Sequence, residues 1–133
     1  MRKLKLQMQI TVDGFVGRSN GELDWMTFAM DDKSLAYIND LANSSDTILL
    51  GRSMTDGFVS HWTSVADNPE SQWHSFAQKM VNTPKVVFSK TLKQSNSANT
   101  TLVNGDLVEE VKKLNKKTVW TSSFMAERIL FQI

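Results

Sequence analysis

The chain has 133 residues, 41% of them hydrophobic and 22% charged, as is typical of one folded domain with a single core. It has no cysteine and only two histidines, which excludes disulfides, zinc–thiolate sites and iron–sulfur clusters and argues against a histidine-built metal centre. With a net charge of +1, no apolar run near the ~20 residues of a membrane span and no signal-peptide pattern, we expect a cytoplasmic protein that binds neither nucleic acid nor membranes.

The first third of the chain predicts two strands separated by a loop and a helix. Residues 3–10 alternate apolar and polar side chains, as a strand with one buried face does. Residues 13–21 form a loop rich in Gly, Asn and Ser, and residues 31–43 carry a helical apolar stripe. Residues 47–50 are a short apolar run, typical of a strand buried on both faces.

The middle of the chain continues the alternation. Gly51 ends the second strand and leads into a short predicted helix. Residues 71–81 place apolar side chains at helical spacing, and Pro84 ends that helix. Residues 86–88 and 100–103 are predicted strands.

The last predicted elements are two helices and a strand. Asp106, with Glu109 three positions later, has the spacing of a helix start, after an Asn-Gly turn. Residues 118–120 predict a final strand, and Ser122 is expected to begin a terminal helix. Strands alternating with helices predict an α/β fold over residues 1–133, with a mostly parallel central sheet and helices on both faces.

Three of the predicted strand ends carry residues suited to phosphate. Glycine permits close backbone approach, helix starts offer free N–H groups, and cations and hydroxyls complete such a site. The residues are Gly51, Arg52 and Ser53, then Ser89, Lys90 and Thr91, then Thr121, Ser122 and Ser123. Each set alone is also an ordinary turn with a surface cation or hydroxyl. Together, at one edge of a parallel sheet, they indicate an extended polyanion such as a dinucleotide, although G-x-G-x-x-G and the P-loop motif are absent.

Several short segments, in order along the chain, resemble the dihydrofolate-reductase-like superfamily. The similarity is greater to bacterial proteins related to the reductase domain of the bifunctional riboflavin-biosynthesis deaminase–reductase, and it covers about residues 1–117. The segments are QITVDGFV at 9–16, NGELDWM at 20–26, DTILLGR at 46–52, VFSKTL at 87–92 and GDL at 105–107. The resemblance implies a three-layer fold that holds NADPH across the strand ends.

The same resemblance implies roles for individual residues. Residues 51–53 would lie at the cofactor diphosphate and residues 89–91 near the adenosine 2′-phosphate. The loop 13–25 would cover nicotinamide and substrate, a small heterocycle of the pteridine or ribosylaminopyrimidine type. The substrate-binding candidates are Asp13, Gly14, Trp25 and Phe28, although Asp13 also suits a turn and the two aromatic residues also suit a core. The catalytic candidates are Asp24 and Asp31, although an Asp at a helix start also complements the helix dipole.

The chain departs from the family pattern after the last predicted strand. Residues 121–123 replace the usual Gly-Gly pair, and the closing C-terminal strands of the family are missing by position 133. We expect a homodimer in which a second subunit covers the open sheet edge. The predicted function is an NADPH-dependent reductase. The alternatives are a catalytically silent nucleotide-binding or dimerising member of the same fold and a flavin-associated domain.

Overall fold

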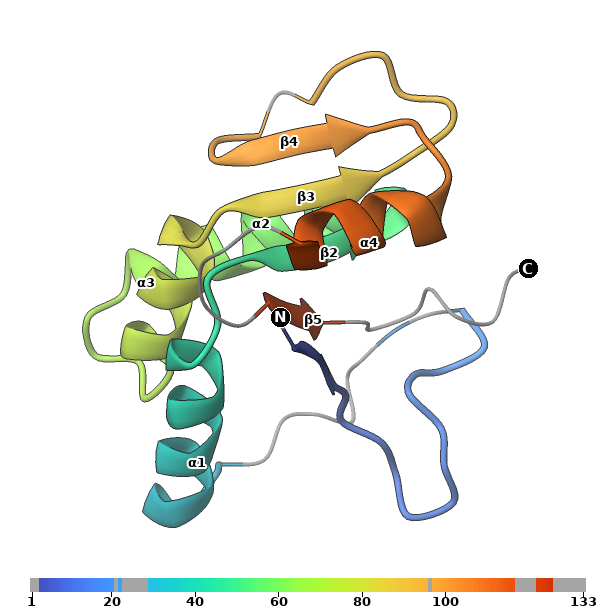
Figure 1. The fold of residues 1–133 in the computed structure, drawn as a ribbon. Helices are drawn as coiled ribbons and strands as arrows, with labels where there is room; N and C mark the ends of the chain where they lie inside the picture. Colours follow the sequence, from blue (N-terminus) through green and yellow to red (C-terminus); the bar gives the residue numbers. More distant parts are fainter. Residues whose placement is uncertain (1–2, 21, 23–28, 96, 117–121, 126–133) are drawn as a thin grey trace.

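A computed structural model describes residues 3–20, 22, 29–95, 97–116 and, for the backbone, 122–125. Its strands form one sheet in the order β1 (Leu4–Gln7), β5 (Ser122–Met125), β2 (Ile48–Gly51), β3 (Lys85–Phe88) and β4 (Thr100–Val103). Every neighbouring pair of these strands is parallel, so their carboxyl ends lie at the same edge, on the right in Figure 1. The predicted parallel α/β architecture is confirmed.

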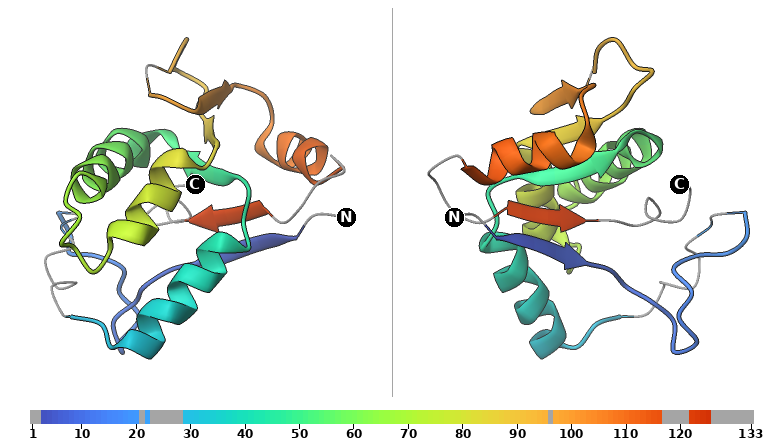
Figure 2. Two further views of the ribbon diagram at one scale, coloured as in Figure 1. Left: turned by 90° about the vertical axis from the view of Figure 1, so that its left-hand side faces the viewer. Right: turned by 45° about the vertical axis from the view of Figure 1, so that its right-hand side comes forward.

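Four described helices flank the sheet on both faces. They are α1 (Asp32–Asn43), α2 (Arg52–Ala66), α3 (His74–Asn82) and α4 (Leu107–Lys116). Figure 2 shows α2 and α3 on one face and α4 on the other, while α1 packs against α3. The helix after Gly51 has 15 residues and is therefore longer than the short helix that the sequence predicts. No helix in the described part of the chain is long and apolar enough to cross a membrane.

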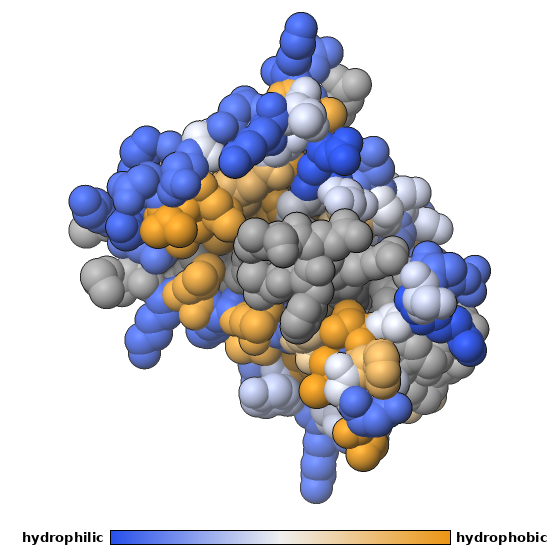
Figure 3. All heavy atoms as spheres, turned by 90° about the vertical axis from the view of Figure 1, so that its right-hand side faces the viewer, coloured by the Kyte–Doolittle hydropathy of each residue, from blue (hydrophilic) through white to orange (hydrophobic). Residues whose placement is uncertain are grey.

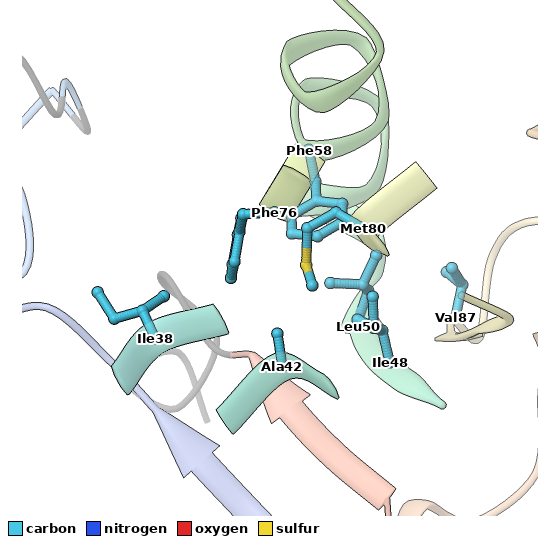
Figure 4. Close-up of a cluster of buried hydrophobic side chains, with 8 residues drawn as sticks. All are labelled: Ile38, Ala42, Ile48, Leu50, Phe58, Phe76, Met80 and Val87. Atoms are coloured by element: carbon cyan, nitrogen blue, oxygen red, sulfur yellow. The ribbon is translucent and has the colours of Figure 1, made fainter. Parts of the chain in front are cut away.

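The core lies between the sheet and helices α1, α2 and α3 (Figure 4). Ile48, Leu50 and Val87 project from β2 and β3 toward Phe76 and Met80 of α3. All five are at most 3% exposed, and burial of each such side chain contributes about 1.5–3 kcal/mol to stability. Because its side chains are buried, β2 has a continuous apolar sequence. The same packing places β2 and β3 at the centre of the molecule.

The edge strand β1 buries the opposite face to the one predicted. Its leucines, Leu4 and Leu6, are 51% and 55% exposed. Lys5 instead faces α1, where its ammonium donates a hydrogen bond to the hydroxyl of Ser44. The predicted strand is therefore confirmed for Leu4–Gln7, but the expectation that its apolar face is buried is wrong. The contact between Lys5 and Ser44 indicates that α1 covers the face of β1 that carries Lys5 and not the face that carries the leucines.

The C-terminal prediction needs a correction. Ser122 and Ser123 do not begin a helix, because they are the first two residues of strand β5. Ser122 pairs with Leu4, and Ser123 pairs with Lys5 and Ile48, which fixes β5 between β1 and β2. The pairing of β5 with a parallel strand on each side, β1 and β2, outweighs the helical pattern of the segment. The predicted strand at 118–120 lies outside the described residues.

Candidate functional site

The carboxyl ends of β2 and β3 bring two predicted site segments together. Gly51 pairs with Phe88, so Arg52 and Ser89 are the first residues beyond two neighbouring strands. Neighbouring strands lie about 4.8 Å apart, so the two segments form one continuous edge. Figure 3 views this edge from the right-hand side of Figure 1, and the top of that face is mainly hydrophilic.

The start of α2 leaves its backbone N–H groups without a side-chain cap. Gly51 is the N-cap, in an ordinary extended conformation, and it has no side chain that could accept a hydrogen bond from the first turn. The first turn contains no acidic residue, and Arg52 and Ser53 are exposed. The buried hydroxyl of Thr55 donates to the carbonyl of Gly51 at 3.0 Å and holds this turn in place. N–H groups without a side-chain cap, the helix dipole and a guanidinium make this helix start suited to an anion.

The turn after β3 presents two exposed polar residues, Lys90 and Thr91. It begins at Ser89, which is only 9% exposed. The hydroxyl oxygen of Ser89 accepts hydrogen bonds from the N–H groups of Thr91, at 3.2 Å, and of Leu92, at 3.0 Å. Of the three residues predicted here, Lys90 and Thr91 are exposed, while the Ser89 hydroxyl is engaged within the turn and lies 3.4 Å from the hydroxyl of Thr91.

Asn104, at the end of β4, holds the same turn from the other side. Its amide nitrogen Nδ2 donates to the carbonyl oxygens of Ser89, at 2.6 Å, and Leu92, at 2.9 Å. The sequence pattern identified Asn104 only as part of an Asn-Gly turn. The position of Asn104 directly after a predicted strand places it at the sheet edge. A sequence pattern does not show, however, in which direction its side chain points.

Asp31 is the N-cap of α1. Its carboxylate accepts hydrogen bonds from the N–H and the hydroxyl of Ser34, both at 2.9 Å. The hydrogen bond from the Ser34 backbone, followed by that from its hydroxyl, lowers the pKa of Asp31 below its usual value. The structure thus gives this carboxylate a capping role, and its catalytic role stays a prediction.

Asp13 and Gly14 lie in a tight turn of the long loop after β1. The hydroxyl of Thr11 donates to the carboxylate of Asp13, and the N–H of Gly14 donates to the carbonyl of Thr11 at 2.9 Å. Gly14 has a φ of +85°, a conformation that glycine adopts without strain. These contacts assign both residues to the turn, and their contact with a substrate stays a prediction.

The remaining predicted site residues fall into two groups. Asp24, Trp25, Phe28 and Thr121 lie outside the described residues. Ser122 and Ser123 belong to the start of β5, at the amino end of the parallel sheet, and therefore not to the edge that carries Arg52 and Lys90. The prediction that they stand at a strand end beside the cofactor is wrong, because the strand lies later in the sequence than expected.

Lys85 is a buried cation that the sequence pattern did not single out. It is 2% exposed, and its ammonium donates to the carbonyl oxygens of Val81 and Thr83, both at 2.9 Å. Burial lowers the pKa of Lys85 below its usual value. Because Lys85 begins β3, it lies at the amino edge and caps the C-terminal end of α3. Its role is structural, and the described residues contain no group of three His, Asp or Glu side chains that could hold a metal ion.

Comparison with known proteins supports the fold. The chain is 31% identical over 123 residues to the "Uncharacterized protein YyaP" of Bacillus subtilis, an alignment covering 90% of this chain and 61% of that protein. A crystal structure of a "Putative riboflavin biosynthesis protein" from Shewanella sp. PV-4 superposes with a TM-score of 0.59 at 21% identity, covering 95% of this chain and 64% of the other. The chain thus spans less than two thirds of each relative. The family model for the RibD C-terminal domain matches residues 2–130, and the chain therefore belongs to the family of RibD C-terminal domains, with their dihydrofolate-reductase-like, reductase-type fold.

Proposed function

We propose that the chain is an NADPH-dependent reductase of a small heterocycle, of the pteridine or ribosylaminopyrimidine type. The observation that carries the proposal is the adjacency of two cationic segments, Gly51–Arg52–Ser53 and Lys90–Thr91, at the carboxyl edge of β2 and β3. A parallel sheet of this kind binds nucleotides at that edge. Membership in a family of reductase-like domains supports the same assignment.

The donor groups at the edge match the anionic groups of NADPH. A diphosphate is bound by free N–H groups and a guanidinium, which the start of α2 and Arg52 supply. A 2′-phosphate on a ribose is bound by a cation and a hydroxyl, which Lys90 and Thr91 supply. The residues present therefore fit the cofactor, and the chemistry that it supplies when bound is hydride donation.

Binding can be tested by titrating NADPH into the protein and following tryptophan fluorescence. We expect saturable quenching, and we expect Arg52→Ala to weaken binding by about 2 kcal/mol, roughly 30-fold, because a charge-assisted hydrogen bond to phosphate is lost. Lys116→Ala is the matched control, since it removes one exposed cation from the C-terminal end of α4, at the other end of the sheet. Equal losses in the two variants, or no binding by the unmodified protein, would refute the proposal.

Turnover is a separate question from binding. NADPH oxidation should accelerate when an oxidised or dihydro pterin, or a ribosylaminopyrimidine, is supplied as the hydride acceptor, and the effect should be lost in Arg52→Ala. A second candidate, a nucleotide-binding protein without reductase activity, is favoured by one observation. Ser122 and Ser123, predicted as further phosphate contacts, belong to the opposite edge. Saturable NADPH binding without turnover on any of these substrates would assign that second function.

A further inference from the structure

We infer that Asn104 and the hydroxyl of Ser89 are positioning groups that set the preference of the site for a 2′-phosphorylated nucleotide. This inference rests on the proposed function, because it concerns the turn that carries Lys90. The two groups do not contact the ligand themselves. They hold the short segment from Ser89 to Leu92 in one conformation, so that Lys90 and Thr91 project from it.

The turn is held at both of its ends by the same two side chains. Nδ2 of Asn104 carries two hydrogens, and the two carbonyl oxygens that it meets, on Ser89 and Leu92, flank Lys90 and Thr91. The Ser89 hydroxyl oxygen accepts the N–H groups of Thr91 and Leu92 from inside the turn. These four hydrogen bonds involve backbone atoms of Ser89, Thr91 and Leu92, and the hydroxyls of Ser89 and Thr91 lie 3.4 Å apart. The side chains of Lys90 and Thr91 are exposed.

The strands beneath the turn fix its position. The N–H of Ser89 donates to the carbonyl of Val103 at 3.0 Å, which continues the pairing of β3 with β4. Asn104 follows Val103 directly, so its side chain is anchored by the end of β4. The buried Val87, two residues before Ser89, ties the same strand to the core. Lys90 is therefore an exposed, long side chain on a rigid base, and a rigid base reduces the entropy lost when such a cation binds a phosphate.

The turn from Ser89 to Leu92 and the first turn of α2 follow neighbouring strands but are separate segments. Arg52 and the free N–H groups of α2 follow β2, whereas Asn104 and Lys90 follow β4 and β3. Loss of the two Asn104 hydrogen bonds should therefore weaken the binding of the 2′-phosphate, which Lys90 contacts, and leave the diphosphate contacts unchanged. NADPH and NADH differ only by the 2′-phosphate, so the ratio of their dissociation constants isolates this effect.

The test compares Asn104→Ala, Lys90→Ala and the double variant, with Kd for NADPH and NADH measured by fluorescence titration of the full chain. We expect Lys90→Ala to reduce the preference for NADPH roughly 10-fold and Asn104→Ala to reduce it about 5-fold. The double variant should lose less of the preference than the two single effects multiplied together, since Asn104 acts through the turn that carries Lys90 and Thr91. Amide hydrogen exchange without any nucleotide should be faster at Thr91 and Leu92 in Asn104→Ala.

Asn39→Ala is the matched control. Its Nδ2 donates to the carbonyl of Leu35 at 2.9 Å inside α1, so this change also removes an amide–carbonyl hydrogen bond, but away from the edge. It should lower thermal stability without changing the NADPH preference. An unchanged preference in Asn104→Ala, or equal losses for NADPH and NADH, would overturn this inference while the proposed function stands. If the unmodified protein binds neither nucleotide, both the proposed function and this inference are overturned.

Discussion

Helices α2 and α4 both begin at the carboxyl edge of the sheet, but their first turns are built in opposite ways. In α4, Asp106 accepts a hydrogen bond from the N–H of Glu109 at 3.1 Å, and Glu109 and Glu110 add two acidic side chains. In α2, Gly51 offers no cap, no acidic residue follows, and Arg52 adds a positive charge. A glycine N-cap is less stabilising than an aspartate N-cap by only a few tenths of a kcal/mol, so the two helix starts differ mainly in their charge and in the N–H group that Asp106 occupies.

The difference between the two helix starts indicates where an anion binds. A capped, acidic start satisfies its own N–H groups and repels a phosphate. An uncapped start with a guanidinium leaves those N–H groups and the positive end of the helix dipole for a ligand. The contrast in charge and capping favours α2 over α4 as the helix start that meets the proposed anion.

The largest expected effect comes from giving α2 the cap that α4 has. Gly51→Asp introduces a carboxylate that accepts a first-turn N–H, and the extended conformation of Gly51 is open to any residue. We expect higher thermal stability together with a loss of NADPH affinity of about 3 kcal/mol, more than 100-fold, because the new negative charge lies where a phosphate binds. Thermal unfolding and fluorescence titration measure the two effects.

Gly51→Asn separates the two causes of that loss. Asparagine caps as well as aspartate does but carries no charge. We expect it to stabilise the helix and to weaken NADPH binding less than Gly51→Asp does, and we expect only the Asp variant to recover affinity partly at high salt. If Gly51→Asp binds NADPH as tightly as the unmodified chain does, the start of α2 is not the diphosphate site.

Sequence patterns were sufficient for the elements whose identity is decided locally. The strand at 100–103 is observed with the predicted bounds, and Asp106 starts the helix that its spacing with Glu109 predicts. Asp31, predicted at a helix start, is the N-cap of α1. The order of strands and helices up to α4 also follows from periodicity, because a helix repeats every 3.6 residues and a strand every two. The sheet edge that carries Arg52 and Lys90 follows from that order and from parallel pairing.

The rest depended on contacts between distant parts of the chain. Ser122 lies in a strand because Leu4 and its neighbours pair with that segment, and no local pattern records such a pairing. Leu4 and Leu6 are exposed while Lys5, on the other face of β1, lies against the end of α1, and an alternating pattern cannot indicate which face a helix covers. The hydroxyl of Ser89 and the amide of Asn104 form hydrogen bonds within the turn after β3. The directions of these side chains are set by the fold and cannot be predicted from a local pattern.

A smaller effect is expected at the capped start of α1. Asp31→Ala should lower the melting temperature by roughly 3 °C, whereas Asp31→Asn should leave it nearly unchanged, since asparagine also caps. The pKa of Asp31 is lower in the folded chain than its usual value of 3.8. The stabilisation is therefore complete above the usual pKa and is lost as the pH falls through the lower folded value. The difference in melting temperature between the unmodified chain and the Asp31→Ala variant should accordingly shrink in that acidic range.

The Asp31→Asn variant also tests the predicted catalytic role of this carboxylate. A lowered pKa keeps Asp31 ionised at neutral pH, which makes it a poor proton donor there. We therefore expect Asp31→Asn to retain both its melting temperature and its rate of NADPH oxidation. A large loss of turnover at unchanged stability would instead assign the proton-transfer role to Asp31.

The smallest expected effect comes from removing one negative charge from the start of α4. Asp106→Ser keeps a side-chain cap on α4 but removes a negative charge beside the turn that carries Lys90. The NADPH affinity should rise by about twofold at low ionic strength, and the gain should disappear at ~1 M salt, where charges more than about 3 Å apart are screened. Titrations at two salt concentrations measure it, with the melting temperature as the check that the cap survives. A salt-independent gain, or a loss of NADPH affinity, would mean that Asp106 affects binding through the structure of the turn and not through its charge. The difference in charge between the starts of α2 and α4 would then have no effect on ligand binding.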